Sequence, residues 1–307
     1  MSLGSATDAL IGEFRARPTL RAGSLIVTVF GDAIAPRGGT VWIGSLIRVL
    51  SDFGISERLV RTSVFRLIRD DWLEVDQVGR RSYYSLSSDG VEEFKQATVR
   101  IYGDPRQSWE GDWCLALLAG LDGEQKEAIR KELAWLGFGA ISANLLAHPK
   151  PVLSELESVL RDAGLDDQVV LMRGTTLDRK QDETMRALVH RRWNLDEIDQ
   201  RYGAFVEQFR PVFRAAQRTK QVDPCLAFQI RTLLIQEYRR ILLRDPLLPP
   251  ELLPAAWNGT AAYQLCRNLY GAVYAAADAF VSDNFETADG PLPPPAREFY
   301  RRFGGLE

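Results

Sequence analysis

The stretch IGSLIRVLSDFGISERLVRTSVFRLIRDDWLEVDQVGRRSYYSL, residues 43–86, decides the fold of the N-terminal third of this chain. Its apolar residues recur at helical spacing up to Gly54, and again after Ser56, a favourable N-cap for a second helix. Two short runs rich in Val, Tyr and Leu follow at 73–78 and 82–86, with Gly79-Arg80-Arg81 between them. The order helix, turn, helix, hairpin predicts a winged helix-turn-helix, a unit that can place its second helix in the major groove of DNA.

The segment before this stretch has to supply the first helix of such a unit. Residues 19–35 contain the apolar run LIVTVF, whose β-branched residues favour a strand, while its length and the following Gly31-Asp32 leave a helix open. We expect a helix, because the winged fold requires one here. Residues 40–43 fit a short edge strand, and residues 1–18 fit either a partly disordered segment or a short helix.

Residues 104–180 have a different pattern. Short apolar runs typical of buried strands alternate with segments of helical period. We expect strands at 113–118, 139–146 and 169–172, and helices at 124–136 and 151–163. Strands that alternate with helices in this way predict a ferredoxin-like α+β middle domain.

The rest of the chain is helical in pattern, with long apolar-periodic segments at 195–219, 225–244 and 255–280. Pro211 predicts a kink or break in the first of these. The predicted fold class is therefore multidomain α+β, with a winged helix-turn-helix at 1–103, the middle domain at 104–180, and an all-α C-terminal domain at 181–307. We expect the last domain to serve dimerisation, effector binding, or both.

Composition limits the class of protein. The chain has no uncharged apolar run of about 18 residues, so no membrane span is predicted, and its N-terminus does not resemble a signal peptide. Its three cysteines are odd in number and far apart, which argues against a disulfide framework and against zinc. We therefore expect a cytoplasmic protein without a metal or other cofactor. The net charge of −3 does not by itself indicate nucleic acid.

Any contact with DNA must therefore depend on where individual charges lie. Residues 1–103 carry 13 Lys and Arg against 12 Asp and Glu, but several of the acids cluster at 70–76, beyond the arginine-bearing turns. Arginine can bind guanine edges with two hydrogen bonds and also neutralises phosphate. The alternative is an ordinary solvated helix face. The candidate DNA-binding residues are Ser56, Arg58, Arg61, Thr62, Arg66, Arg80 and Arg81.

A second set of arginines could bind a polyanionic small molecule, although a solvated face or helix-end ion pairs would explain them equally. These candidate effector-binding residues are Arg210, Arg214, Arg218, Arg239 and Arg240. Catalysis has little support in the sequence. The only histidines, His148 and His190, fit surface or capping roles, and no nucleophile elbow, metalloprotease motif or phosphate-binding loop occurs. No catalytic residue is predicted.

Four stretches in chain order resemble a known family, the phenylacetic-acid degradation operon repressors, or PaaX family, within the GntR-like winged-helix regulators. They are residues 24–56, residues 57–90, WCLALL at 113–118 with GFGAI at 137–141, and EYRRILLRDPLLPPELLPAAWNGTAA at 237–262. The resemblance implies a winged helix, a ferredoxin-like middle domain and a helical C-terminal domain. It implies that Arg58, Arg61 and Thr62 lie on the DNA-reading helix.

The resemblance also implies partners. The family's members are homodimeric repressors that bind a palindromic double-stranded operator and release it on binding an acyl-CoA, phenylacetyl-CoA in the named members; no membrane is involved. The family pattern has a histidine where this chain has Gln236, so the effector here can differ. The middle domain is similar to CRISPR-associated ferredoxin-like endonucleases, but no carboxylate cluster at its strand ends supports nuclease activity. The alternatives are an acyl-CoA-processing enzyme with a winged-helix interaction module, and a repressor with a non-CoA effector.

Overall fold

The structure, a computed structural model, describes residues 2–17, 22–104 and 109–306, apart from the side chain at 179. The chain forms two compact units. Unit 1 consists of Met1–Asp104, Gly203–Arg240 and Gly259–Glu307, and unit 2 of Pro105–Tyr202 and Ile241–Asn258. The expected division at residues 103 and 180 follows the order of elements along the chain and stays a prediction.

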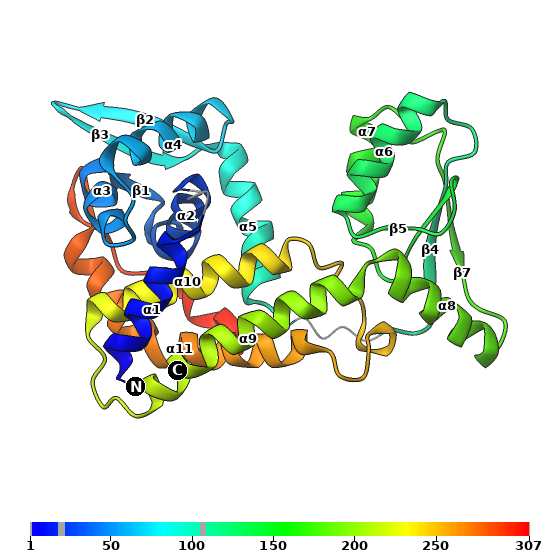
Figure 1. Cartoon of the computed structure of the whole chain (residues 1–307). Helices are drawn as coiled ribbons and strands as arrows, with labels where there is room; N and C mark the ends of the chain where they lie inside the picture. Colours follow the sequence, from blue (N-terminus) through cyan, green and yellow to red (C-terminus); the bar gives the residue numbers. More distant parts are fainter. Residues whose placement is uncertain (1, 18–21, 105–108, 307) are drawn as a thin grey trace. The chain divides into compact units, whose positions relative to one another are not determined.

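The N-terminal part of unit 1 is a set of helices and a small sheet (Figure 1). The expected helix in the LIVTVF run and the edge strand after it are confirmed, although residues 19–21 of the expected helix lie outside the described part. The open N-terminal segment is a helix. The elements are α1 (Leu3–Arg15), α2 (Ala22–Val29), η1 (Phe30–Ile34, a π-helical turn), η2 (Ala35–Arg37), β1 (Thr40–Trp42), α3 (Ile43–Ser51), α4 (Glu57–Arg69), β2 (Leu73–Val78), β3 (Arg81–Leu86) and α5 (Ser88–Tyr102).

The three strands form an antiparallel sheet in the order β1-β3-β2. The predicted three-residue hairpin tip is wrong by one residue, because Arg81 pairs with Val78 in the β-ladder. The turn is therefore Gly79-Arg80 alone. Gly79 has a φ of +63°, a left-handed conformation that glycine adopts without strain. The hairpin extends beside α4 (Figure 1).

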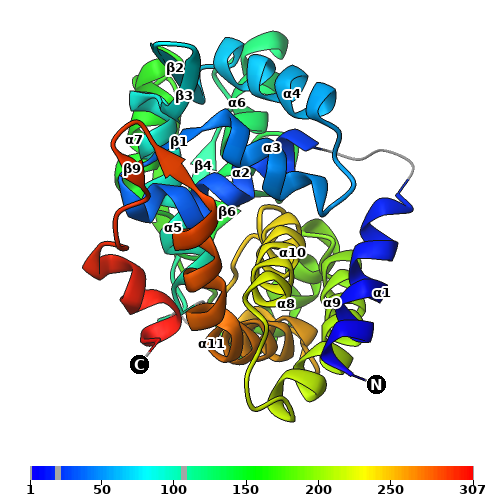
Figure 2. The same ribbon diagram turned by 90° about the vertical axis from the view of Figure 1, so that its left-hand side faces the viewer.

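Long helices complete unit 1. They are the later turns of α9 (Leu195–Gln217), most of α10 (Pro224–Leu242) and α11 (Asn258–Asn284), followed by β8 (Glu286–Thr287), β9 (Gly290–Pro291) and η4 (Arg297–Gly304). The helix α9 continues through Pro211, so the proline does not end it. The helix α1 lies alongside α9, where Gln208 Nε2 donates a 2.7 Å hydrogen bond to Glu13 Oε2 (Figure 2).

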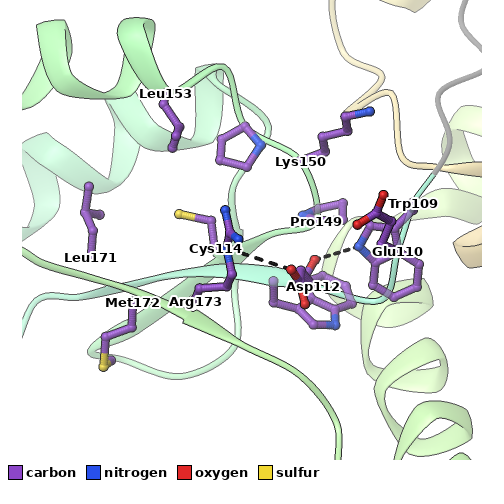
Figure 3. Close-up of a pocket in the computed structure, with 12 residues that line it drawn as sticks. Trp109, Glu110, Asp112, Cys114, Pro149, Lys150, Leu153, Leu171, Met172 and Arg173 are labelled. Carbon is purple, nitrogen blue, oxygen red and sulfur yellow. Dashed lines mark hydrogen bonds and ion pairs between the residues drawn. The ribbon is translucent and has the colours of Figure 1, made fainter.

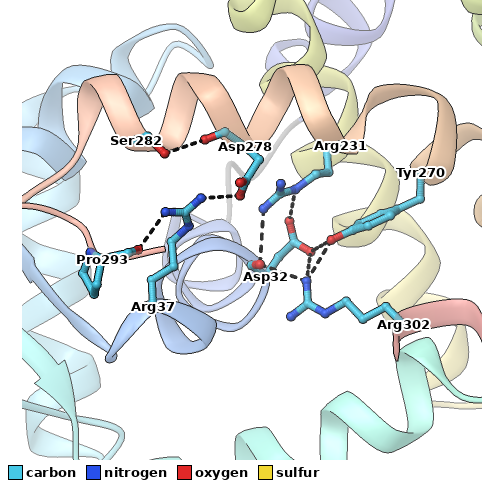
Figure 4. Close-up of polar contacts among 8 residues, drawn as sticks. All are labelled: Asp32, Arg37, Arg231, Tyr270, Asp278, Ser282, Pro293 and Arg302. Carbon is cyan, nitrogen blue, oxygen red and sulfur yellow. Dashed lines mark hydrogen bonds and ion pairs between the residues drawn. The ribbon is translucent and has the colours of Figure 1, made fainter. Parts of the chain in front are cut away.

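A buried ionic cluster joins the N-terminal and C-terminal segments of unit 1 (Figure 4). Asp32, in the π-helical turn, pairs with Arg231 Nε of α10 at 2.6 Å and with Arg302 NH1 of η4 at 2.9 Å. The hydroxyl groups of Tyr102 and Tyr270 donate to Asp32 Oδ1 at 2.7 and 2.9 Å. One carboxylate thus satisfies donors from four elements.

The charges of this cluster depend on one another. Burial alone would raise the pKa of the Asp32 carboxyl, but Arg231, Arg302 and the hydrogen bond from Tyr102 outweigh it and hold the pKa below 3.8. Burial raises the pKa of both tyrosine hydroxyls, so they stay protonated donors. Removing one partner of a buried ion pair leaves an uncompensated charge, which typically costs about 3–5 kcal/mol.

Unit 2 contains a four-stranded antiparallel sheet in the order β5-β6-β4-β7. The order β-α-β-β-α-β along the chain is the predicted ferredoxin-like arrangement. The elements are β4 (Trp113–Leu117), α6 (Gly123–Trp135), β5 (Gly139–Ala140), β6 (Leu145–His148), α7 (Leu153–Asp162), β7 (Val170–Gly174), α8 (Arg179–Arg192), the first turns of α9 and η3 (Pro250–Leu252). One expected strand, at 139–146, is wrong: Ile141 and Ser142 donate to the Leu145 carbonyl at 2.9 and 3.1 Å, and this turn splits it in two.

The sheet of unit 2 packs on both faces. On one face, Ala116 and Leu146 lie in a core with Ile129 and Leu133 of α6 and Leu156 of α7. On the other face a second core combines neighbouring strand residues with α8 and the segment around η3: Trp113, Ala147, Val189, Trp193, Leu195, Leu248 and Leu252. The alternation of side chains along β4 and β6 explains why both are apolar on each side.

The histidines and cysteines have ordinary structural positions. His148 is buried, not on the surface as one expectation had it, and its Nδ1 accepts a 2.9 Å hydrogen bond from the Lys150 amide. His190 lies 3.3 Å from Asp196 on the surface. The three cysteines are free. Within the described residues no group of three metal-ligating side chains occurs, and none of the helices is long and apolar enough to cross a membrane.

The Asp32 cluster gives a stability prediction. Asp32→Asn keeps the shape but leaves Arg231 and Arg302 buried without an anion, so we expect a loss of about 3–5 kcal/mol in the free energy of unfolding at pH 7. The pKa of Asp32 is lowered by folding, so its stabilisation is present above the unfolded-state pKa of about 3.8 and is lost as the pH falls through the lower folded-state pKa. Urea unfolding at several pH values measures both effects.

The control for this variant is Glu92→Gln, which removes the carboxylate of an exposed pair with Lys95 on α5. An exposed pair is screened by water and should contribute less than about 1 kcal/mol. The gap in stability between wild type and Asp32→Asn should narrow below pH 4. Equal effects of the two substitutions at pH 7 would contradict the role given to Asp32.

Candidate nucleic-acid interface

The helix α4 is fixed by its cap and its apolar face. Ser56 is the N-cap, and its Oγ accepts a 3.4 Å hydrogen bond from the Leu59 amide. Val60, Ser63 and Val64 are buried, and they hold the helix against α2 and α3. The period of the buried residues leaves one broad face of α4 in solvent.

That exposed face contains most of the predicted DNA contacts. Its members are spaced by three or four residues, so they form one stripe along the helix. The stripe consists of Arg58, Arg61, Thr62, Phe65, Arg66 and Arg69, all exposed. Sequence reasoning did not identify Phe65, which interrupts the polar stripe with an aromatic ring; its place on the polar face of the helix was the available signal.

Within the described residues, the polar side chains of the stripe make only local contacts. Arg61 pairs with Glu57 at 2.8 Å, and Thr62 Oγ1 donates to the Arg58 carbonyl at 2.8 Å. Exposed pairs of this kind are weak, so the guanidinium groups can exchange them for phosphate or base atoms at little cost. The Oγ of Ser56 accepts the capping bond, so its O–H can still donate a hydrogen bond to a phosphate oxygen.

The hairpin places its two arginines differently. Arg80 is exposed in the two-residue turn. Arg81 lies in the sheet, where its guanidinium carbon sits 4.3 Å from the Trp42 ring centroid and its NH1 lies 3.1 Å from Glu286 Oε2. Arg81, next to the turn, therefore braces the hairpin against β1 and β8, while Arg80 is the cation in the turn itself.

The five candidate effector arginines lie on different elements and have different hydrogen-bond and ion-pair partners. Arg210 and Arg214 are exposed one turn apart on α9, and Arg218 is exposed just beyond its end. Arg240 is exposed and pairs with Glu237 at 3.3 Å. Arg239 is half-buried and donates to Ser24 Oγ at 3.0 Å, and burial lowers the pKa of its guanidinium.

Gln236 has a structural role in unit 1. Its Oε1 accepts a 2.6 Å hydrogen bond from Thr28, and its Nε2 donates to Ser24 at 2.9 Å. Gln236 is almost fully buried, and its two hydrogen bonds join α10 to α2. The helix α2 in turn packs on α4. The residue that departs from the family pattern therefore connects two elements of unit 1.

Unit 2 contains a pocket of about 480 Å³ beside the sheet (Figure 3). Its walls are largely apolar, with Trp109, Pro149, Leu153, Leu171 and Met172 among them, and its volume falls in the range of small-molecule sites. Lys150 and Arg173 supply positive charge at the same pocket, and Arg173 lies 3.8 Å from Asp112. Sequence reasoning did not find this pocket, because its lining comes from separate strands and a loop.

Two further groups in the pocket bear on its chemistry. Burial raises the pKa of the Cys114 thiol, against an opposing effect of Arg173, so the thiol is protonated and a poor nucleophile. Trp113 is 3% exposed, and its indole Nε1 has no hydrogen-bond partner within the described residues. This nitrogen has almost no accessible surface, so it is an unsatisfied donor inside the core of unit 2, and a ligand in the pocket does not reach it.

The structure thus defines a class: an α+β protein with a capped, arginine-striped helix beside a basic-tipped hairpin, and a separate pocket in unit 2 with a volume in the range of small-molecule sites. Family profiles match in three consecutive parts. They are described as PaaX-like protein at residues 21–90, PaaX protein central Cas2-like domain at 106–186, and PaaX-like protein C-terminal domain at 193–283.

A curated relative agrees with these profiles. The chain is 42% identical to the transcriptional repressor PaaX of Escherichia coli (strain K12) over 284 residues, which cover 92% of this chain and 90% of the relative. The chain belongs to the PaaX family. Among solved structures, the uncharacterized protein Rv0674 from Mycobacterium tuberculosis matches with a TM-score of 0.56 at 21% identity, covering 85% of this chain and 99% of that one; this likeness concerns the fold alone.

Proposed function

We propose that this protein is a dimeric transcriptional repressor of a phenylacetate or related aromatic-acid operon, released from its operator by an acyl-CoA such as phenylacetyl-CoA. The observation that carries the proposal is the exposed arginine stripe of α4, in a chain 42% identical to a named transcriptional repressor. In this proposal the N-terminal elements are a winged helix-turn-helix of the GntR-like kind, with α4 as the DNA-reading helix and the β2–β3 hairpin as the wing.

In this proposal the side chains of α4 contact bases and phosphates, and those of the hairpin contact the DNA backbone or hold the wing in place. Arg58, Arg61 and Arg66 can reach base edges or phosphates from the exposed face, and arginine is well suited to guanine because its fork matches the O6 and N7 acceptors. Thr62 supplies a hydroxyl that can both donate and accept. Arg80 at the wing tip contacts the phosphate backbone, and Arg81 holds the wing in position through Trp42 and Glu286.

The homodimer follows from the proposed operator. A palindromic site is read by a protein with two-fold symmetry, in which two copies of α4 enter successive major grooves about 34 Å apart. Affinity from phosphate contacts falls with salt, whereas contacts to base edges give the sequence preference.

The effector acts by preferring one conformation. It can release the operator only if it binds the off-DNA state more tightly, and a coupling of about 1–3 kcal/mol is typical. We place the acyl group in the pocket of unit 2, whose apolar wall suits a phenyl ring, with Lys150 and Arg173 near the phosphates. The exposed arginines of α9 and α10 remain further candidates for the phosphate groups.

The DNA-reading role of α4 gives the first prediction of this proposal. Arg61→Ala should weaken binding to the specific operator by about 1–3 kcal/mol and relax the preference at one base pair of each half-site. The fold should be unchanged, because the Arg61 side chain is exposed and its ion pair with Glu57 is also exposed. Gel shifts and footprints on the DNA upstream of the gene that encodes this protein measure this effect.

The matched control is Arg161→Ala, which removes an exposed arginine from α7 and alters net charge equally. We expect its operator affinity to equal that of the wild type. Normal affinity and an unchanged footprint for Arg61→Ala would remove α4 from the proposal.

The pocket gives the second prediction of this proposal. Leu153→Asp puts a carboxylate into the apolar wall of the pocket at a residue that is 53% exposed, so the core is not disturbed. The bound acyl group would desolvate the introduced carboxylate, and the carboxylate would repel the phosphates. The phenylacetyl-CoA concentration needed to release DNA should therefore rise by about tenfold or more, without a change in operator affinity. Gel shifts with a titrated panel of acyl-CoA esters and free CoA measure the response.

The control is Val152→Asp, the adjacent residue, which is 56% exposed and does not line the pocket. Its response to the ester should match the wild type. If both variants respond as the wild type does, the effector binds elsewhere; if no ester releases the wild-type complex, the acyl-CoA part of the proposal is wrong.

A further inference from the structure

A single aromatic ring interrupts the polar stripe of α4. Phe65 is 69% exposed, and of the fourteen phenylalanines, all in the part of the chain that the structure describes, it alone is classed as exposed. It lies one helical turn from Arg61 on one side and from Arg69 on the other, with Thr62 and Arg66 beside it. Its neighbours on the surface are therefore the polar groups of the same stripe.

The ring does not serve the packing of the helix. The buried side of α4 is supplied by Val60, Ser63 and Val64, and the half-buried Leu59 and Leu67 flank them. Phe65 is exposed on the side of the helix away from these residues. Whatever covers the arginines of the stripe must also cover Phe65.

We propose that Phe65 reads a thymine in each operator half-site by packing on the C5-methyl group in the major groove. This inference rests on the proposed function of α4. In the major groove, the thymine methyl is the apolar group that distinguishes one base from the others, and phenylalanine is among the side chains that contact it. Over the other base edges the ring would cover polar atoms without giving them a hydrogen bond, which is unfavourable. Phe65 therefore adds a thymine preference that no arginine can supply.

The test removes only the methyl group. In a footprinted operator, each thymine is replaced in turn by dU, which keeps the base pair and lacks the methyl, and affinity is measured by gel shift. For the wild type we expect one position per half-site at which dU lowers affinity by about fourfold, the effect of one apolar carbon group. Phe65→Ala should lose affinity for the normal operator and should be insensitive to dU at that position, as a double-mutant cycle requires.

The matched control is Trp135→Ala, which removes another aromatic side chain of nearly equal exposure, 71%, from α6. It should retain the full dU effect and the wild-type affinity. Circular dichroism and urea unfolding of Phe65→Ala should match the wild type, because the ring is exposed; Phe65→Leu, which keeps an apolar group, should retain part of the dU sensitivity.

The outcomes separate this inference from the proposed function. If Arg61→Ala weakens specific binding while no thymine position responds to dU, the role of Phe65 is wrong and α4 is still the reader. If Phe65→Ala lowers affinity but remains as sensitive to dU as the wild type, the ring does not contact the methyl group and the inference is overturned. If neither Arg61→Ala nor any substitution in the stripe changes specific binding, both proposals fail together.

Discussion

The carboxylate of Asp32 is the constraint on which unit 1 depends. Asp32 forms ion pairs with Arg231 and Arg302, which follow it in the sequence by 199 and 270 positions. The π-helical turn, α10 and η4 therefore meet at one buried group. A buried carboxylate is tolerated only with cations and hydrogen-bond donors around it, and here two arginines and two tyrosines supply them. The C-terminal segments therefore stabilise the turn after α2 in this position.

This constraint has a consequence for the candidate reader. The helix α4 packs on α2, and α2 is joined to α10 through the hydrogen bonds of Thr28 and Ser24 with Gln236 and Arg239. The exposed stripe thus belongs to the same compact unit as most of the long helices. A small shift of α10 would be transmitted to α4 through packed side chains, which is how closely packed elements couple.

Local signals in the sequence predicted the elements well. The Ser56 cap and the spacing of Val60 and Val64 predict α4, and the alternation around Gly79 predicts the hairpin to within one residue. Long-range partners were not predictable in the same way. The pairing of Asp32 with Arg302 has no local spacing signal, and neither has the hydrogen bond that Arg239, a candidate effector ligand, donates to Ser24. The pocket of unit 2 was not predicted from the sequence for the same reason, since its walls come from separate segments.

The charge of the chain also shapes how a reader of this kind must achieve selectivity. With a net charge of −3 and a nearly neutral N-terminal region, the protein has little general attraction for the phosphate backbone. Non-specific binding competes with specific binding at very many sites, so weak general attraction raises the share of affinity that comes from base edges. Guanidinium groups on their own contribute to both kinds of binding, because they also neutralise phosphate. An aromatic ring among them contributes to sequence preference alone, which gives a reason for an exposed Phe65 in the middle of an arginine stripe.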